Sequence, residues 1–144
     1  MHLKYILELT SPISNISLPE KISNIQRLRV NKVRYVTASL NNHYMIINIK
    51  GWNDSSWLFN GTQVLPLTCF LILPPTTLTL SYYENTNMLF DSEKDQPIAS
   101  LSNFMIELLI DGNYSSDISP SNPVYLEIYC ECRLKKLLKP QVSQ

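Results

Sequence analysis

The side chains that could carry out acid–base or nucleophilic chemistry in this sequence are few and scattered. His2 and His43 are the only histidines, and neither stands in a motif with a serine or cysteine nucleophile. Glu107, Glu127 and Glu131 could form a carboxylate pair for general acid–base catalysis. Each of them alternates with apolar neighbours, however, which predicts a solvent-facing position on a strand. We therefore expect no enzyme activity.

The three cysteines could bind a metal or serve as small apolar side chains. Cys130 and Cys132 are two residues apart, which puts them on one face of a strand with their Cα atoms about 7 Å apart. A zinc site needs four ligands, and the spacing of Cys69 and His43 does not predict that they join this pair. We expect three reduced, buried thiols and neither a metal nor another cofactor.

Aromatic side chains gather in the segment GWNDSSWLFNG, residues 51–61, which two of the chain's three glycines bracket. It contains Trp52, Trp57 and Phe59. These rings could form a platform for a sugar beside the segment's asparagines and aspartate, or a lid that closes one end of the core. They could also anchor an interface with another chain, because tryptophan is enriched among the residues that dominate binding energy. The sequence leaves the three roles open.

A basic tail closes the chain. Residues 133–139 hold four cations and three leucines. Such a tail is usually solvated, although its leucines also suit docking onto a neighbouring subunit. The residues of the aromatic segment and the tail that we predict as candidate subunit or loop contacts are Trp52, Trp57, Phe59, Leu134, Lys135, Lys136 and Leu137.

The composition narrows the class of protein. The chain has 144 residues, which fits one domain, and its twelve basic and twelve acidic side chains balance. A neutral chain without a basic stripe gives no reason to expect a nucleic-acid partner. Charged residues make up 17% of the chain, below the roughly 25% of an average domain, which indicates a surface that neighbours cover. The sequence contains neither a membrane-span pattern nor a signal-peptide pattern, so we expect a reducing cytosolic compartment.

Alternation of apolar and polar residues dominates the sequence and predicts strands. Residues 25–38 change the phase of this alternation, which predicts a bulge near Asn31–Lys32. The apolar run at residues 62–73 is typical of a strand that is buried on both faces or covered by a partner, with Pro66 at an edge or a break. Further strands are expected at residues 3–10, 43–50, 76–83, 102–111 and 124–134.

Turn residues separate these strands. Residues 11–21 contain two prolines and predict a connection, and Asp111–Gly112 predicts a tight turn. Residues 84–100 form the longest polar stretch, with room for a short strand at 87–90, and we expect it at the end of the molecule opposite the aromatic segment. Seven or eight strands without crossover helices predict an all-β, antiparallel sandwich or barrel.

Two stretches resemble viral single jelly-roll proteins. ISLPEKISNIQRLRVNKVRYV at residues 16–36 is similar to an early strand entered from a proline-containing loop. SLSNFMIELLIDGNY, followed by NPVYLEIYCE, is similar to the closing pair of strands. The chain therefore resembles the penton-type minor capsid proteins of tailless double-stranded DNA viruses of the adenovirus, polinton, virophage and giant-virus kind.

This resemblance implies a fold, a partner and a location. It implies a single jelly roll over residues 1–134 with about eight strands and with the first and last strands paired, followed by a basic tail at residues 135–144. It also implies five copies around a capsid vertex, contacts with other capsid proteins, and a location in the virion and, during assembly, in the host cytoplasm. Two alternatives are another minor or cement protein of the shell, and a carbohydrate-binding or attachment module with a sugar ligand.

Overall fold

Nine antiparallel strands build the part of the chain that the structure, a computed structural model, describes: residues 2–37, 41–52, 56–75, 81–85 and 87–132. No residue of this part is helical, so it contains no helix that could cross a membrane. The strands are β1 (His2–Leu9), β2 (Ile13–Thr37), β3 (His43–Lys50), β4 (Ser56–Phe59), β5 (Val64–Leu67), β6 (Cys69–Leu73), β7 (Ser81–Glu84), β8 (Phe90–Ile110) and β9 (Val124–Cys132).

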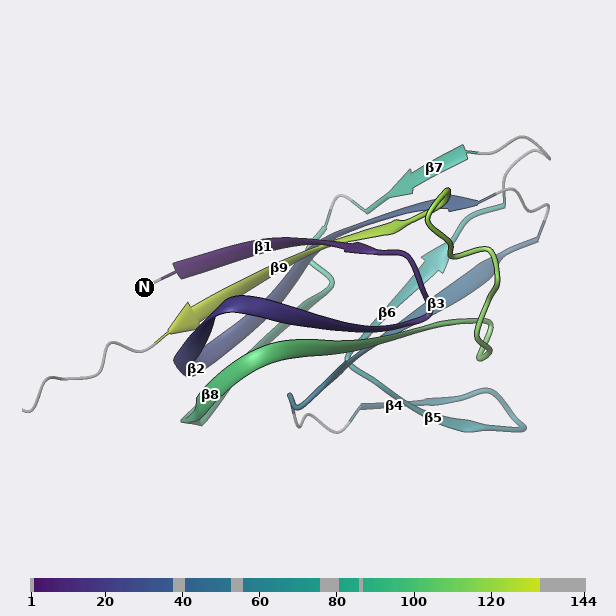
Figure 1. Cartoon of the computed structure of the whole chain (residues 1–144). Coiled ribbons are helices and arrows are strands. Elements are labelled where there is room, and N and C mark those ends of the chain that lie inside the picture. Colours follow the sequence, from purple (N-terminus) through teal and green to yellow (C-terminus); the bar gives the residue numbers. More distant parts are fainter. Residues whose placement is uncertain (1, 38–40, 53–55, 76–80, 86, 133–144) are drawn as a thin grey trace, which may run out of the picture.

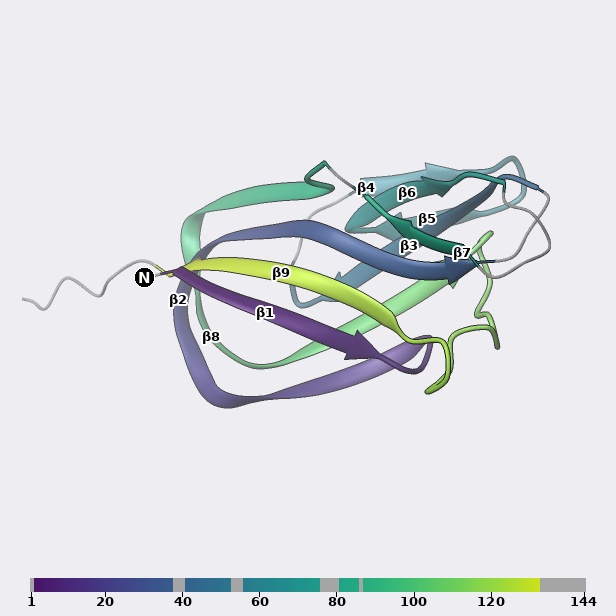
Figure 2. The ribbon, with the colours of Figure 1, turned by 90° about the horizontal axis from the view of Figure 1, so that it is seen from above.

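One hydrogen-bonded sheet folds over on itself to form the two layers of a sandwich (Figures 1 and 2). The two longest strands, β2 and β8, bend at one end of the molecule and contribute to both layers. We call the layer of β1, β9, the second part of β2, β7 and the first part of β8 sheet I. Sheet II contains the first part of β2, the second part of β8, β3 and β6.

This pairing has the order of a jelly roll. Each layer has four strand positions, because β2 and β8 each contribute to both layers, and in sheet I β7 and the first part of β8 pair with successive stretches of β2 and share one position. The first and last strands of the described chain, β1 and β9, pair antiparallel from His2–Glu131 to Leu9–Val124. The predicted all-β single jelly roll, with about eight strand positions and paired terminal strands, is confirmed.

The predicted bulge lies in β2, where the pairing with β9 shifts between Val30 and Lys32. A buried amide holds the backbone at this position. Asn85 Nδ2 donates a hydrogen bond to the Asn31 carbonyl (3.0 Å), and Asn85 Oδ1 accepts one from the Val33 amide. The bulge allows the apolar residues on both sides of it to face the core although the phase of their alternation changes.

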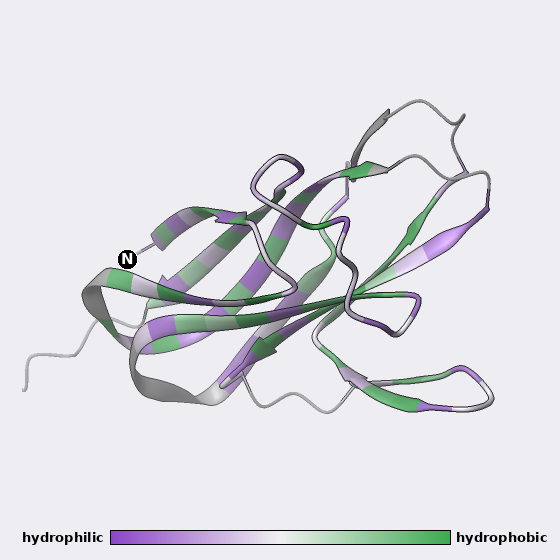
Figure 3. Cartoon of the chain, turned by 45° about the vertical axis from the view of Figure 1, so that its right-hand side comes forward, coloured by the Kyte–Doolittle hydropathy of each residue, from purple (hydrophilic) through white to green (hydrophobic). Residues whose placement is uncertain are grey.

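The core lies between the two layers and is apolar throughout. β9 is the most regular contributor, since every second residue from Val124 to Cys132 is buried. Figure 3 shows the corresponding bands of hydrophobic and hydrophilic residues along the strands. The ring of Tyr5 meets that of Phe104 edge-on across the core, with their centroids 5.9 Å apart.

Two of the sequence-based predictions are wrong. Residues 11–21 are not a connection, because β2 begins at Ile13, and much of the polar stretch 84–100 belongs to β8. The misleading signal came from prolines and polar residues at the bends. Pro19 and Pro97 lie where the pairing of β2 with β8 shifts, so their missing amide hydrogens interrupt no regular ladder. The predicted turn at Asp111–Gly112 is confirmed, with positive φ at both residues.

Candidate functional site

The candidate acid–base residues are not brought together. His2 contacts Tyr129, whereas His43 Nδ1 lies 2.8 Å from Asp111 Oδ2. The predicted outward glutamates also lie on different layers. Glu107, on sheet II, accepts a hydrogen bond from the Tyr114 hydroxyl at 2.6 Å, which raises the pKa of that hydroxyl. Glu127 and Glu131 lie on β9 of sheet I, where the Lys4 ammonium is 3.4 Å from Glu127.

The three cysteines are buried in the core as reduced thiols. Burial raises the pKa of Cys130 to about 12, and it also raises the pKa of Cys69 and of Cys132. A thiol with a raised pKa is a poor nucleophile and a poor metal ligand, because both roles need the thiolate. Among the described residues, no group of three or more histidine, cysteine, aspartate or glutamate side chains is placed to hold a metal ion.

The aromatic segment divides into a lid and an exposed hairpin. Trp52 is only 6% exposed and belongs to the core cluster, beside Phe104 and the end of β3. The Lys94 ammonium lies 5.3 Å from the centre of its indole ring. Lys94 is part of the polar stretch 84–100, so the prediction that this stretch and the aromatic segment lie at opposite ends of the molecule is wrong. The two meet at the bend of β2 and β8.

β4 and β5 form the exposed hairpin, which lies on the outer side of sheet II (Figure 1). Residues opposite one another in an antiparallel pair point to the same side. Trp57 is opposite Pro66, and Phe59 is opposite Val64, so these four residues share one side of the hairpin. That side faces away from the sandwich, since Trp57, Phe59 and Val64 are 54%, 72% and 55% exposed.

The inner side of the hairpin covers sheet II. Leu58 and Leu65 are opposite one another and half-buried. Ile46 and Leu109 are paired on the outer surface of sheet II, and both are buried although neither belongs to the central core cluster. A Cβ atom on Gly112 would lie 3.3 Å from the Leu65 side chain. The hairpin therefore makes a second, smaller apolar layer outside the sandwich.

Asn60 fixes the tip of the hairpin. Its Oδ1 atom accepts hydrogen bonds from the amides of Thr62 (3.1 Å) and Gln63 (2.7 Å), which closes the turn. Its Nδ2 atom donates to the Tyr44 hydroxyl at 3.4 Å and to Gln63 Oε1 at 3.2 Å. Tyr44 belongs to β3, so this amide both shapes the turn and ties it to sheet II. With both ends of the amide in use, the turn has no free group at this residue for a sugar.

Strand β6 extends the exposed apolar surface at the edge of sheet II. Pro66 lies within β5 of the two-stranded hairpin, so the predicted edge position is confirmed, whereas the apolar run divides later, at Thr68, between β5 and β6. Of the two alternatives for this run, the strand buried on both faces is wrong, and cover by a partner stays a prediction. Phe70 and Ile72 point outward and are exposed, while the alternate residues enter the core. We group the outward residues of the hairpin and of this edge, which follow one another in the chain, as the hairpin face: Trp57, Phe59, Val64, Pro66, Phe70 and Ile72.

The hairpin face belongs to a segment without charge. Residues 55–83 contain no aspartate, glutamate, lysine, arginine or histidine. This gap is the signal that could have added the residues that the sequence analysis missed: Val64, Pro66, Phe70 and Ile72. Of the predicted contact residues, Trp57 and Phe59 lie together on the hairpin face, and Trp52 is the buried lid. Residues 134–137 of the tail lie outside the described residues.

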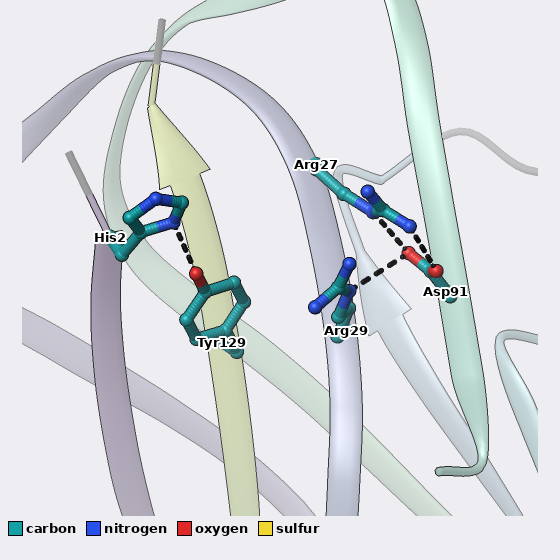
Figure 4. A network of polar contacts seen from close by, with 5 residues as sticks. All are labelled: His2, Arg27, Arg29, Asp91 and Tyr129. Atoms are coloured by element: carbon teal, nitrogen blue, oxygen red, sulfur yellow. Dashed lines mark hydrogen bonds and ion pairs between the residues drawn. The ribbon is translucent and has the colours of Figure 1, made fainter.

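The outer surface of sheet I is charged. Arg27 binds Asp91 through two hydrogen bonds, Nε–Oδ1 at 2.6 Å and Nη2–Oδ2 at 2.5 Å (Figure 4). The pair holds the pKa of Asp91 below its usual range. Arg29 lies over the Tyr129 ring, 5.4 Å from its centre. We call this surface the charged face, whose charged residues are Lys4, Glu8, Arg27, Arg29, Lys32, Arg34, Glu84, Asp91, Glu93, Glu127 and Glu131.

The charged face also has a shallow hollow of about 330 Å³. Two cations and two anions line it together with two apolar residues: Ile6, Lys32, Arg34, Glu84, Tyr125 and Glu127. Lys32 and Glu84 lie 3.9 Å apart across the strands. Because neither sign of charge is in excess, the hollow has no field that would select an anionic or a cationic ligand.

No protein-family model matches the chain, and no curated protein matches it. The inference of function therefore depends on the fold and on the contrast between the hairpin face and the charged face.

Proposed function

We propose that this chain is a structural protein of a viral shell, a minor capsid subunit of the kind that occupies vertices. Two observations support this proposal. The fold is a single jelly roll with paired terminal strands, as the resemblance to penton-type capsid proteins implies. The described surface, in addition, carries a large uncharged apolar area.

The hairpin face is the observation that carries the proposal. With roughly 200 Å² for a whole aromatic residue, Trp57 at 54% and Phe59 at 72% exposure each leave on the order of 100 Å² uncovered. With its four other residues the face presents roughly 500 Å², within the range of about 300–600 Å² for the largest, often functional patch of a typical monomer. Such a surface suits a subunit that acts by binding protein neighbours.

The neighbours are copies of this chain and other capsid proteins. Five copies around a vertex would use a head-to-tail contact, in which two different surfaces of the subunit meet and a rotation closes the ring. The tail residues Leu134, Lys135, Lys136 and Leu137 add a segment that can dock onto a neighbour. The proposed location is the virion and, during assembly, the host cytoplasm.

Native mass spectrometry of the purified full chain tests the vertex role. We expect masses at five times the 16.6 kDa subunit, or at multiples of that ring. A chain that stays monomeric and binds pre-assembled shells would replace the vertex role by that of a cement protein. A monomer whose Trp57 fluorescence is quenched by a sugar would contradict the structural role and support a carbohydrate-binding module.

A further inference from the structure

We propose that the hairpin face binds the same face of a second copy of this chain, in a contact with two-fold symmetry. This contact goes beyond the vertex ring and does not depend on it. A ring needs two different surfaces in each contact, whereas a two-fold contact uses one self-complementary surface twice.

The absence of charge on the hairpin face indicates which partner surface fits it. The hairpin face has no charged residue, and residues 55–83 contain none. A partner that brought charged groups onto it would have to remove them from water without offering them an opposite charge. On the described surface of this chain, the outer side of sheet I carries charges on every strand, so it is a poor partner for the hairpin face. The apolar, uncharged surface that fits is the hairpin face of another copy.

The size of the face fits a two-fold contact. A standard protein–protein interface takes about 800 Å² from each partner, and the six residues of the hairpin face supply roughly 500 Å² of apolar surface by the exposed fractions given above. The hairpin backbone and the polar residues of its tip can supply the rim. Trp57 is the type of residue that dominates such interfaces.

A comparison of two edge strands, β1 and β6, supports the same conclusion. β1 is one edge, and its outward side chains include Lys4 and Glu8, charges of the kind that keep an exposed edge from pairing with other chains. β6 is another edge, and its outward side chains are Phe70 and Ile72. An edge without charges is protected when another molecule covers it. β6 and the exposed hairpin lie on the same side of the molecule (Figure 2).

Substitution of the face, with a matched change on the opposite side, tests the proposal. We expect the wild-type chain to form dimers, or rings joined in pairs, in native mass spectrometry. The assembly formed by the double variant Trp57→Ser/Phe59→Ser should have half the mass of the wild-type assembly. Ile6→Ser is the control, because Ile6 is 69% exposed on the outer side of sheet I and its loss should leave the mass unchanged. Odd-numbered wild-type masses alone, or an unchanged mass of the double variant, would overturn the proposal.

A mixing experiment separates a two-fold contact from a head-to-tail one. Affinity-tagged wild-type chain and untagged Trp57→Ser/Phe59→Ser are each assembled before they are mixed, so that a ring cannot carry both chains, and the captured untagged chain is quantified by mass spectrometry. In a two-fold contact the altered face has no partner, so we expect capture to fall at least tenfold relative to untagged wild type. In a head-to-tail contact the variant's other surface still binds the wild-type hairpin face, and its capture would overturn the proposal.

A second variant, outside the hairpin, separates loss of the contact from unfolding of the hairpin. Ile72→Thr changes the same face from β6 at a side chain that is 59% exposed, and the inward residues of the strand remain in the core. Its dimer should also weaken, while its melting temperature stays close to that of the wild type. If this variant keeps its fold and dimerises as strongly as wild type, the edge strand is not part of the contact and the proposal fails in this form.

Discussion

The two outer surfaces of the sandwich differ although one alternating pattern builds both layers. On sheet I most outward residues are charged, and several pair with one another, as Arg27 pairs with Asp91. On sheet II, Ile46 and Leu109 are outward yet buried, because the β4–β5 hairpin covers them. Alternation thus defines which residues enter the core. The outward residues of a sheet are apolar where another segment covers them, as the hairpin covers sheet II, and mostly polar where they face solvent.

The two surfaces also differ in the interactions that stabilise them. Ion pairs on the charged face are solvent-screened and contribute little individually. Apolar contacts under the hairpin remove side chains from water, and such burial stabilises by about 1.5–3 kcal/mol for a whole aliphatic side chain. The hairpin surface should therefore respond strongly to substitution of its buried residues, and the charged surface weakly.

The largest effect is expected at Ile46. Ile46→Ala removes a fully buried side chain beneath the hairpin and should lower the free energy of unfolding by about 2–4 kcal/mol. Urea unfolding followed by tryptophan fluorescence measures it. The matched change on the other surface, Ile6→Ala, should cost less than about 0.5 kcal/mol because Ile6 is exposed. Equal small costs at the two sites would show that the hairpin does not shield sheet II.

Substitution of Asn85 should have the next largest effect on the free energy of unfolding. Its side chain holds the bulge of β2 in sheet I through buried hydrogen bonds. Asn85→Ala leaves the Val33 amide and the Asn31 carbonyl at the bulge without their side-chain partner. Buried groups of this kind cost about 1–3 kcal/mol each when unsatisfied, so we expect a loss of about 2 kcal/mol or more in chemical denaturation. Asn85→Asp keeps the acceptor for Val33 and should recover part of the loss at low pH, where its carboxyl is protonated.

Sequence reasoning predicted the fold better than the surfaces. The alternation in β9 and the phase change near Asn31 follow from short-range sterics, so the sequence contains them. The bends of β2 and β8 depend on pairing between distant segments, and Pro19 therefore looked like part of a loop. Trp52 and Trp57 have similar neighbours in sequence, yet one is a lid and the other is exposed, because only the path of the chain after β3 decides which ring meets the core.

An intermediate effect is expected at the contact between the hairpin tip and the turn after β8. Gly112 has φ of 84°, and a Cβ atom there would lie 2.9 Å from Gln63 Oε1. Gly112→Ala should cost about 1–2 kcal/mol through its left-handed backbone conformation, and it should also displace the tip. Hydrogen exchange measures the second part, as faster exchange at residues 57–66 with little change in β9. Uniformly faster exchange would mean that the hairpin and the sandwich unfold as one unit.

The smallest effect is expected on the charged face, at Asp91. Because Arg27 lowers the pKa of Asp91 in the folded state, the ionised carboxylate stabilises the fold above the unfolded-state pKa of about 3.9. That stabilisation is lost as the pH falls through the lower, folded-state pKa. Asp91→Asn should therefore lower the melting temperature by a few degrees at most at neutral pH, and the difference from wild type should close below about pH 4. Added salt should reduce the difference at neutral pH, since salt screens a surface pair. A large, salt-independent loss would mean that the charged face, like the hairpin face, depends on buried contacts.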